Sequence, residues 1–125
     1  MHELSLCEGI ASAVERTAAQ HGIRRVASVR VAVGALAGVD LPSLRFAWPS
    51  VATGVLDGAS LVVEEPEGTA WCTDCCETVP LQRLGDACPR CGGFHLFPNG
   101  GTELKVIDFV PLDDQASSET SAKKN

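Results

Sequence analysis

Two Cys-x-x-Cys pairs with twelve residues between them constrain the fold of this chain more than any other feature. A two-residue gap lets both sulfur atoms of a pair face one point, and four thiolates in a tetrahedron are a standard ligand set for structural zinc. In the second pair, Pro89 restricts the turn between the two cysteines, and Gly92 after the pair lets the backbone pass close to the sulfur. We therefore predict a closed structural zinc site made by Cys72, Cys75, Cys88 and Cys91.

Alternatives to this site stay open at the level of sequence. Cys76 stands where a turn of this kind usually has glycine, and it offers a register in which Cys72 pairs with Cys76. Two disulfides are a second alternative, but they need an oxidising compartment. A catalytic zinc is disfavoured, because four thiolates leave no position for water.

The start of the chain, Met-His-Glu-Leu-Ser, lacks the basic segment that opens a signal peptide. The longest apolar runs fall far short of the ~20 residues that span a bilayer. Without an export signal, six cysteines favour a reducing cytoplasm and metal binding over disulfides. We expect a cytoplasmic protein with no membrane partner.

The charge of the chain argues against nucleic acid as a partner. The formal net charge is −6 and the pI is about 4.9. Between Glu67 and Asn99 two arginines stand against four carboxylates, and a zinc ion held by four thiolates adds further negative charge. Such a region is poorly suited to contact a phosphate backbone.

Residues 5 to 21 have the periodicity of an amphipathic helix. Ser5 and Glu8 fit a capping box, and His21-Gly22 fits a C-terminal stop. The predicted apolar face consists of Leu6, Cys7, Ile10, Ala13, Val14, Thr17 and Ala18. On this face Cys7 is expected to be a small core residue.

The next elements alternate between strand and helix. We predict a strand at residues 25 to 33, a loop at residues 34 to 38, and a second strand at residues 60 to 65. Asp40 can cap a second helix with Pro42 in its first turn, and Pro49 is expected to kink or interrupt that helix. The predicted core face of this helix is Leu41, Leu44, Trp48 and Val51.

The cysteine region divides the chain. We expect hinges at residues 66–68 and 99–101, and a return strand at 103–110 that joins the sheet formed before residue 66. The predicted fold is α+β, with two helices on a small, mostly antiparallel three-stranded sheet and an inserted zinc-ribbon-like module. The predicted domains are 1–66 plus 100–111 and 67–99, and the polar tail, 112–125, is expected to be disordered.

The N-terminus carries donors for a second metal. The Met1 α-amine, the His2 amide nitrogen and the His2 Nδ1 atom can form fused five- and six-membered chelate rings. Such donors lie in one plane, which suits square-planar Ni²⁺ or Cu²⁺. Glu3 can complete the site with its amide nitrogen or its carboxylate. From the residues alone, the alternative is that His2 and Glu3 belong to a frayed terminus.

A family resemblance rests on these features in combination. The chain starts Met1-His2-Glu3, continues as a helix–strand–helix–strand unit with Gly34 closing the first strand, and returns from the four-cysteine insertion through Gly-Gly-x-Glu-Leu. Over residues 1 to about 111 this order resembles the HypA family of nickel metallochaperones for [NiFe]-hydrogenase maturation. The chain departs from that pattern at Cys76 and in its longer polar tail.

The resemblance implies function, partners and site residues. It implies Ni(II) as a transient cargo at Met1, His2 and Glu3, with Asp40 as an acidic residue able to approach the metal. It implies a HypB-type GTPase and the hydrogenase large subunit as partners, and it allows a role in urease maturation.

We expect no enzyme, since the sequence shows no P-loop, no dinucleotide fingerprint and no Ser/His/Asp set that would form a nucleophilic site. The alternative function is a zinc-ribbon interaction or regulatory module that binds no nickel.

Overall fold

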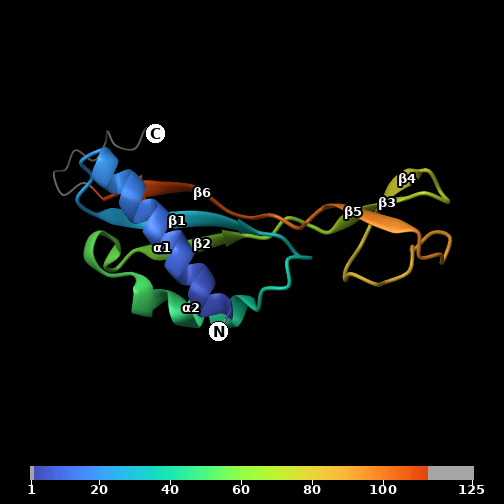
Figure 1. Cartoon of the computed structure of the whole chain (residues 1–125), viewed down its shortest axis with the longest axis horizontal. Helices are drawn as coiled ribbons and strands as arrows, with labels where there is room; N and C mark the ends of the chain where they lie inside the picture. The colour runs from blue at the N-terminus through green and yellow to red at the C-terminus, as the bar shows by residue number, and fades with distance from the viewer. Residues whose placement is uncertain (1, 113–125) are drawn as a thin grey trace. The chain divides into compact units, whose positions relative to one another are not determined.

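The computed structural model describes residues 2–112, and Figure 1 shows their course. They divide into two compact units. Unit 1 holds residues 2–31, 40–62 and 106–112, and unit 2 holds residues 32–39 and 63–105. The predicted domains differ from these units in assigning 32–39, 63–66 and 100–105 to the first domain, and as folding units they stay a prediction. The predicted disordered tail lies, from residue 113 on, outside the described part of the chain.

Unit 1 is a layer of helices on a sheet. Helix α1 (His2–Gln20) lies across the sheet and α2 (Leu41–Val51) lies beside it, as Figure 1 shows. A short 3-10 helix, η1 (Gly54–Leu56), precedes the second strand. The strands are β1 (Val26–Val33), β2 (Ser60–Glu64) and β6 (Leu104–Pro111), in the order β2-β1-β6. The predicted α+β class is therefore confirmed.

The core of unit 1 follows the predicted periodicity. Helix α1 buries Cys7, Ile10, Val14 and Ala18, which belong to the predicted apolar face, together with Ala11. The Cys7 thiol donates to the Leu44 carbonyl at 3.4 Å, so Cys7 is a core residue as predicted. Helix α2 contributes Leu44 and Trp48, while Leu41 and Val51 are only half-buried. Within residues 2–112, no helix combines the length and the apolar character that crossing a bilayer requires.

The predicted start of α1 is wrong by three residues. The helix begins at His2, and Ser5 lies inside it rather than capping it. A capping box is a local signal, whereas Glu3 has a long-range partner, since its carboxylate accepts the backbone N–H of Asp40 at 3.0 Å. Its negative charge in the first turn also favours a helix N-terminus. His2 and Glu3 therefore belong to the first turn of the helix.

Helix α2 begins as predicted and ends differently. The Asp40 carboxylate caps it by accepting the Ser43 N–H, and Pro42 lies in its first turn. The expected interruption at Pro49 does not occur, because the helix continues to Val51. Pro49 is exposed in the last turn, where losing one ladder hydrogen bond disturbs few residues.

Unit 2 contains a second sheet that the sequence did not resolve into strands. Antiparallel strands β3 (Thr69–Cys72), β4 (Glu77–Pro80) and β5 (Leu96–Gly100) lie in the order β4-β3-β5. One buried cluster consists of Leu36, Ala70 and Leu81, and another of Cys72, Val79 and Cys88. Leu96 packs against both, so the apolar core of unit 2 adjoins its cysteines.

The predicted hinge at residues 99–101 is wrong for its first two residues, which lie in β5. The Asn99 side chain is fixed by hydrogen bonds with Thr69 and Thr78 on the neighbouring strands. Gly101 does adopt a left-handed backbone, with φ of 85°, and its carbonyl accepts the Leu36 N–H at 2.7 Å. A side chain at Gly34 would collide with the Gly101 backbone, so glycine is required where these segments cross.

Candidate metal centres

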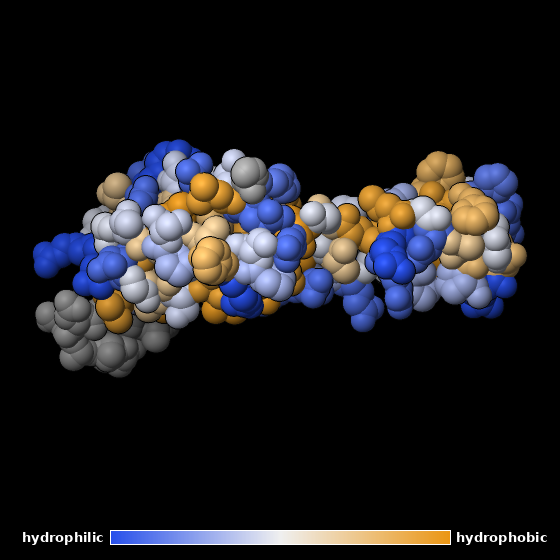
Figure 2. Space-filling view, turned by 90° about the horizontal axis from the view of Figure 1, so that it is seen from below, coloured by the Kyte–Doolittle hydropathy of each residue, from blue (hydrophilic) through white to orange (hydrophobic). Residues whose placement is uncertain are grey.

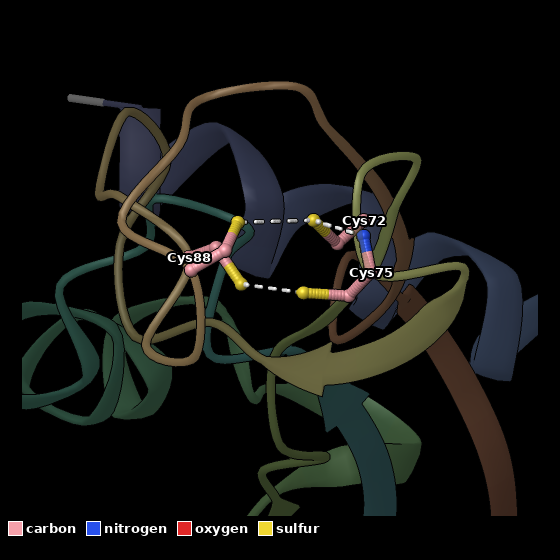
Figure 3. Close-up of side chains that lie close together, drawn as sticks. Cys72, Cys75 and Cys88 are labelled. Carbon is pink, nitrogen blue, oxygen red and sulfur yellow. Dashed lines mark hydrogen bonds between the residues drawn. The ribbon is translucent and has the colours of Figure 1, made fainter.

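Four sulfur atoms converge at the end of unit 2. The cluster consists of Cys72, Cys75, Cys88 and Cys91, whose Sγ atoms all lie within 4.8 Å of one another. Figure 3 shows the sulfurs of the three labelled cysteines pointing toward a common centre. Cys72 is the last residue of β3, while Cys88 and Cys91 belong to the loop between β4 and β5. The structure therefore brings together the four cysteines of the predicted zinc site.

The two Cys-x-x-Cys turns have matching backbone geometry. In the first, the Cys76 N–H donates to the Cys72 carbonyl at 2.8 Å, and in the second the Gly92 N–H donates to the Cys88 carbonyl at 2.9 Å. Each turn also directs an N–H at its first sulfur, from Cys75 to Cys72 at 3.4 Å and from Arg90 to Cys88 at 3.3 Å. Such bonds stabilise thiolates, which is the form that binds a metal.

Cys76 occupies the position that Gly92 has in the second turn. Both residues have a left-handed backbone, with φ of 57° at Cys76 and 76° at Gly92. The Cys76 thiol is exposed and points to the Thr73 carbonyl at 3.5 Å, away from the sulfur cluster. The geometry therefore favours Cys75 over Cys76 as the fourth sulfur.

The sulfur cluster fits a tetrahedral zinc ion in size. With Zn–S bonds of about 2.3 Å, the sulfurs of a tetrahedron are about 3.8 Å apart. The Cys72 and Cys91 sulfurs are 3.8 Å apart, and those of Cys75 and Cys88 are 4.0 Å apart. A zinc ion held by all four sulfurs would have no open position for a reacting water.

The clustered thiols have shifted pKa values. The Cys91 N–H, followed by that of Arg90, lowers the pKa of Cys88 to about 7. Burial, followed by hydrogen bonds to the neighbouring thiols, raises the pKa of Cys75 to about 12. A bound divalent cation would favour the thiolate form of these groups.

A polar pair beside the cluster, His95 and Asp74, was not indicated by the sequence. His95 Nδ1 lies 3.0 Å from Asp74 Oδ2, and the His95 carbonyl accepts the Thr73 N–H at 3.2 Å. These contacts tie the first cysteine turn to the start of β5. The two residues are 21 positions apart, and no local pattern connects them.

The second predicted site lies at the start of α1. The His2 side chain is 64% exposed, and its Nδ1 atom is 3.9 Å from the Glu3 carboxylate, whose side chain is only 17% exposed. The hydrogen bond from the Asp40 N–H lowers the pKa of Glu3, and the Glu3 backbone N–H acts in the same direction. Glu3 is therefore an ionised acceptor held next to a solvent-facing imidazole.

Asp40 is brought to this site by the α1–α2 contact. Its backbone N–H binds Glu3, while its carboxylate accepts the Ser43 hydroxyl at 2.9 Å and caps α2. The structure thus places the fourth candidate residue beside Glu3, with its side chain in use as a cap. Nothing in the sequence near residue 40 indicated that its N–H would bind a carboxylate at residue 3.

Helix geometry also leaves the amide nitrogens at this end outside the hydrogen-bond ladder of the helix. The first four N–H groups of an α-helix have no acceptor within the helix. Since α1 begins at His2, the amides of His2 and Glu3 belong to this set. A metal that displaces their protons would therefore break no hydrogen bond of the helical ladder.

Comparisons with known proteins agree with one another. Residues 1–110 match the family described as hydrogenase/urease nickel incorporation, metallochaperone, hypA. The chain is 49% identical to the hydrogenase maturation factor HypA of Xanthobacter autotrophicus over 113 residues, which cover 90% of this chain and 100% of the relative. It is 50% identical to the protein of the same name from Polaromonas naphthalenivorans over 115 residues, 91% of this chain and 100% of the relative.

Two solved structures share the fold. One is the solution structure of the Ni metallochaperone HypA from Helicobacter pylori, with a TM-score of 0.62 and 18% identity over 88% of this chain and 97% of that chain. The other is a solution structure of HypA protein, with a TM-score of 0.66 and 20% identity over 90% of this chain and 97% of that chain.

Proposed function

The chain belongs to the HypA family of hydrogenase and urease nickel-incorporation metallochaperones, and we propose that it binds Ni(II) at its N-terminus and delivers it during [NiFe]-hydrogenase maturation. The proposed donors are Met1, His2 and Glu3. The observation that carries the proposal is the start of α1 at His2, which sets an exposed imidazole beside backbone amides that have no acceptor within the helix. The metal is a cargo, and we expect no catalytic turnover.

Nickel titration of untagged, zinc-loaded protein tests this proposal. We expect one nickel ion per chain, and we expect His2→Ala to eliminate that binding because it removes the imidazole donor. His21→Ala is the matched control, since His21 is also exposed but lies after the other end of α1. Binding that survives in His2→Ala, or that is lost equally in both variants, contradicts the site.

The roles of Glu3 and Asp40 are separable by conservative substitutions. Glu3→Gln keeps an oxygen that can accept the Asp40 N–H but removes the charge, and Asp40→Asn keeps a good helix cap. If either carboxylate coordinates nickel, its variant weakens nickel binding while thermal stability changes little. If Glu3 contributes only its backbone nitrogen, Glu3→Gln binds nickel as tightly as the wild type.

We propose that the cysteine cluster holds Zn(II) through Cys72, Cys75, Cys88 and Cys91. When bound, zinc would cross-link the β3 end to the loop between β4 and β5, and it has no open position for chemistry. Metal analysis of Cys75→Ser and Cys76→Ser tests the assignment. We expect zinc to be lost in the first variant and retained in the second, and the reverse result would establish the longer register.

The proposed partners are a HypB-type GTPase and the hydrogenase large subunit, with urease maturation proteins as further candidates. The solvent-facing side of α1 carries Glu8, Glu15 and Arg16, and the helix begins at the nickel residues. We therefore propose that the GTPase contacts α1. We also propose that the protein works in the cytoplasm. The alternative, a zinc-ribbon module without nickel, predicts no nickel binding in the titration above.

A further inference from the structure

The sheet of unit 2 presents an aromatic pair on the face turned away from the cysteines. Along β3, Ala70 and Cys72 are buried, whereas Trp71 between them is 42% exposed. Because side chains of a strand alternate between faces, Trp71 points to the opposite side from the metal cluster. Its register partner on β5 is Phe97, which is 60% exposed. The two aromatic side chains therefore stand next to each other in solvent.

Four more side chains share this face. The register places Thr78 of β4 beside Trp71, and Thr69 of β3 beside Pro80. Asn99 of β5 accepts the Thr69 hydroxyl at 2.7 Å and donates to Thr78 Oγ1 at 3.2 Å, which sets it on the same side. We call the set Thr69, Trp71, Thr78, Pro80, Phe97 and Asn99 the aromatic face. Hydrogen bonds across all three strands hold its polar members in place.

The aromatic face has no charged residue, although unit 2 is strongly charged. Unit 2 contains seven carboxylate residues and three basic ones, a net charge of −4. Two of these charges pair with each other elsewhere, Arg90 with Glu77 at 2.9 Å, beside the cysteines. Absence of charge together with exposed aromatic residues is typical of the centre of a protein–protein interface. Figure 2 shows hydrophobic surface next to strongly hydrophilic residues in this part of the molecule.

The charge around the aromatic face and the size of the face indicate which kind of protein it can bind. A second copy would bring another net charge of −6, so the surroundings of the face would repel it. At these exposures Trp71 and Phe97 offer about 200 Å² together, so a stable dimer, which buries about 800 Å² per partner, would have to extend over the charged surroundings of the face. The face suits a transient partner that offers an apolar pocket bordered by lysine and arginine.

We propose that the aromatic face of unit 2 is a docking surface for the enzyme precursor that receives the metal, and that Trp71 and Phe97 enter an apolar pocket with a basic rim on that protein. The choice of partner rests on the proposed nickel delivery, while the surface itself rests on the residues above. It lies on a different unit from the α1 surface proposed for the GTPase. A short-lived contact of this kind suits a carrier that must release its acceptor.

Binding of the nickel-free hydrogenase large-subunit precursor to full-length, zinc-loaded protein tests this proposal. The variant Trp71→Thr/Phe97→Thr removes both aromatic rings and keeps residues that favour strands. We expect affinity for the precursor to fall at least about tenfold and wild-type affinity to fall as salt rises. Phe46→Thr is the matched control, since Phe46 on α2 in unit 1 is 87% exposed, and it should bind like the wild type.

Further variants and readouts separate docking from folding and from nickel binding. Zinc content and nickel affinity should be unchanged in the double variant. If the double variant loses zinc, the single variant Phe97→Lys is tested in its place. This substitution alters one exposed position and places a positive charge against the basic rim of the partner. Unchanged affinity in a zinc-loaded variant, or equal loss in Phe46→Thr, overturns the proposal.

The two proposals can fail separately. Wild-type protein that binds nickel but not the precursor contradicts the docking surface and leaves the nickel site standing. Wild-type protein that binds the precursor through the aromatic face but takes no nickel contradicts nickel carriage and leaves the docking surface standing.

Discussion

The two units of this protein are stabilised by different means. Unit 1 buries apolar residues from α1, α2, η1 and the sheet, including Val14, Val29, Leu44 and Leu56. Unit 2 buries two small clusters, one of which contains the cysteines Cys72 and Cys88. Small units with little apolar core usually need a metal or a cross-link. We therefore expect unit 1 to stay folded without zinc and unit 2 to unfold without it.

The largest expected effect follows from breaking the sulfur cluster. Cys91→Ser leaves three thiolates, so we expect zinc to be lost and unit 2 to unfold, because zinc binding and folding of such a unit are one process. Unit 1 should keep its helices. Circular dichroism and amide exchange of the variant measure both units, and a single transition that abolishes all helix signal would refute the division.

The reciprocal change removes core volume from unit 1. Leu44 is fully buried on α2, and its backbone carbonyl accepts the Cys7 thiol. Leu44→Ala should destabilise unit 1 by about 2–5 kcal/mol through lost burial and a cavity. Zinc content should be unchanged, because the cysteines belong to unit 2. Loss of zinc in this variant at temperatures where α1 has melted would show that the units do not fold separately.

Local signals explain which parts of this structure were predictable. The four-cysteine cluster was anticipated because a two-residue gap lets both sulfurs of a turn face one point. The Asp40 cap and the buried stripe of α1 likewise depend on residues a few positions apart. The signals that failed were overruled by distant contacts. Glu3 pairs with the backbone of residue 40, which lets the helix begin at His2 instead of at a cap on Ser5.

The strands of the unit 2 sheet were also not predictable from local signals. Strands β3, β4 and β5 are four or five residues long, too short for a clear alternation to stand out from turn residues. Asn99 and Gly100 have the composition of a hinge, yet they lie in β5 because Asn99 finds partners on the other two strands. Cross-strand hydrogen bonds, rather than propensity, place these residues in a strand.

A smaller change tests the backbone of the first cysteine turn. Cys76 has a φ of 57°, a conformation that costs a residue with a side chain about 1–2 kcal/mol. Cys76→Gly should stabilise unit 2 by up to about 1 kcal/mol, because glycine adopts this conformation freely but loses more entropy on folding. Thermal unfolding with zinc analysis measures both effects. Loss of zinc would mean that Cys76 is a ligand and that the turn differs from the one described.

The smallest expected effect lies on the exposed surface of unit 1. Arg30 and Asp108 form a two-point ion pair between β1 and β6, with contacts of 3.0 and 2.7 Å. The pair lowers the pKa of Asp108 from its ordinary 3.8, so its stabilising effect is complete above that value and is lost as the pH falls through and below it. Asp108→Asn should melt slightly lower than the wild type at pH 7, and the difference should shrink in acid. A constant difference would assign the effect to packing.

The role of the Met1 amine gives the most direct test of the proposed nickel site. The measurement compares Ni²⁺ affinity of three zinc-loaded proteins: untagged, extended by one residue at the N-terminus, and tagged at the C-terminus. Extension converts the amine into an amide and moves His2 one position along, although every original side chain remains. We expect nickel affinity to collapse in the extended protein, to be unaffected by the C-terminal tag, and to rise with pH in the untagged protein as the amine loses its proton near pH ~8. Equal affinity in all three proteins would remove the amine from the site and contradict the account.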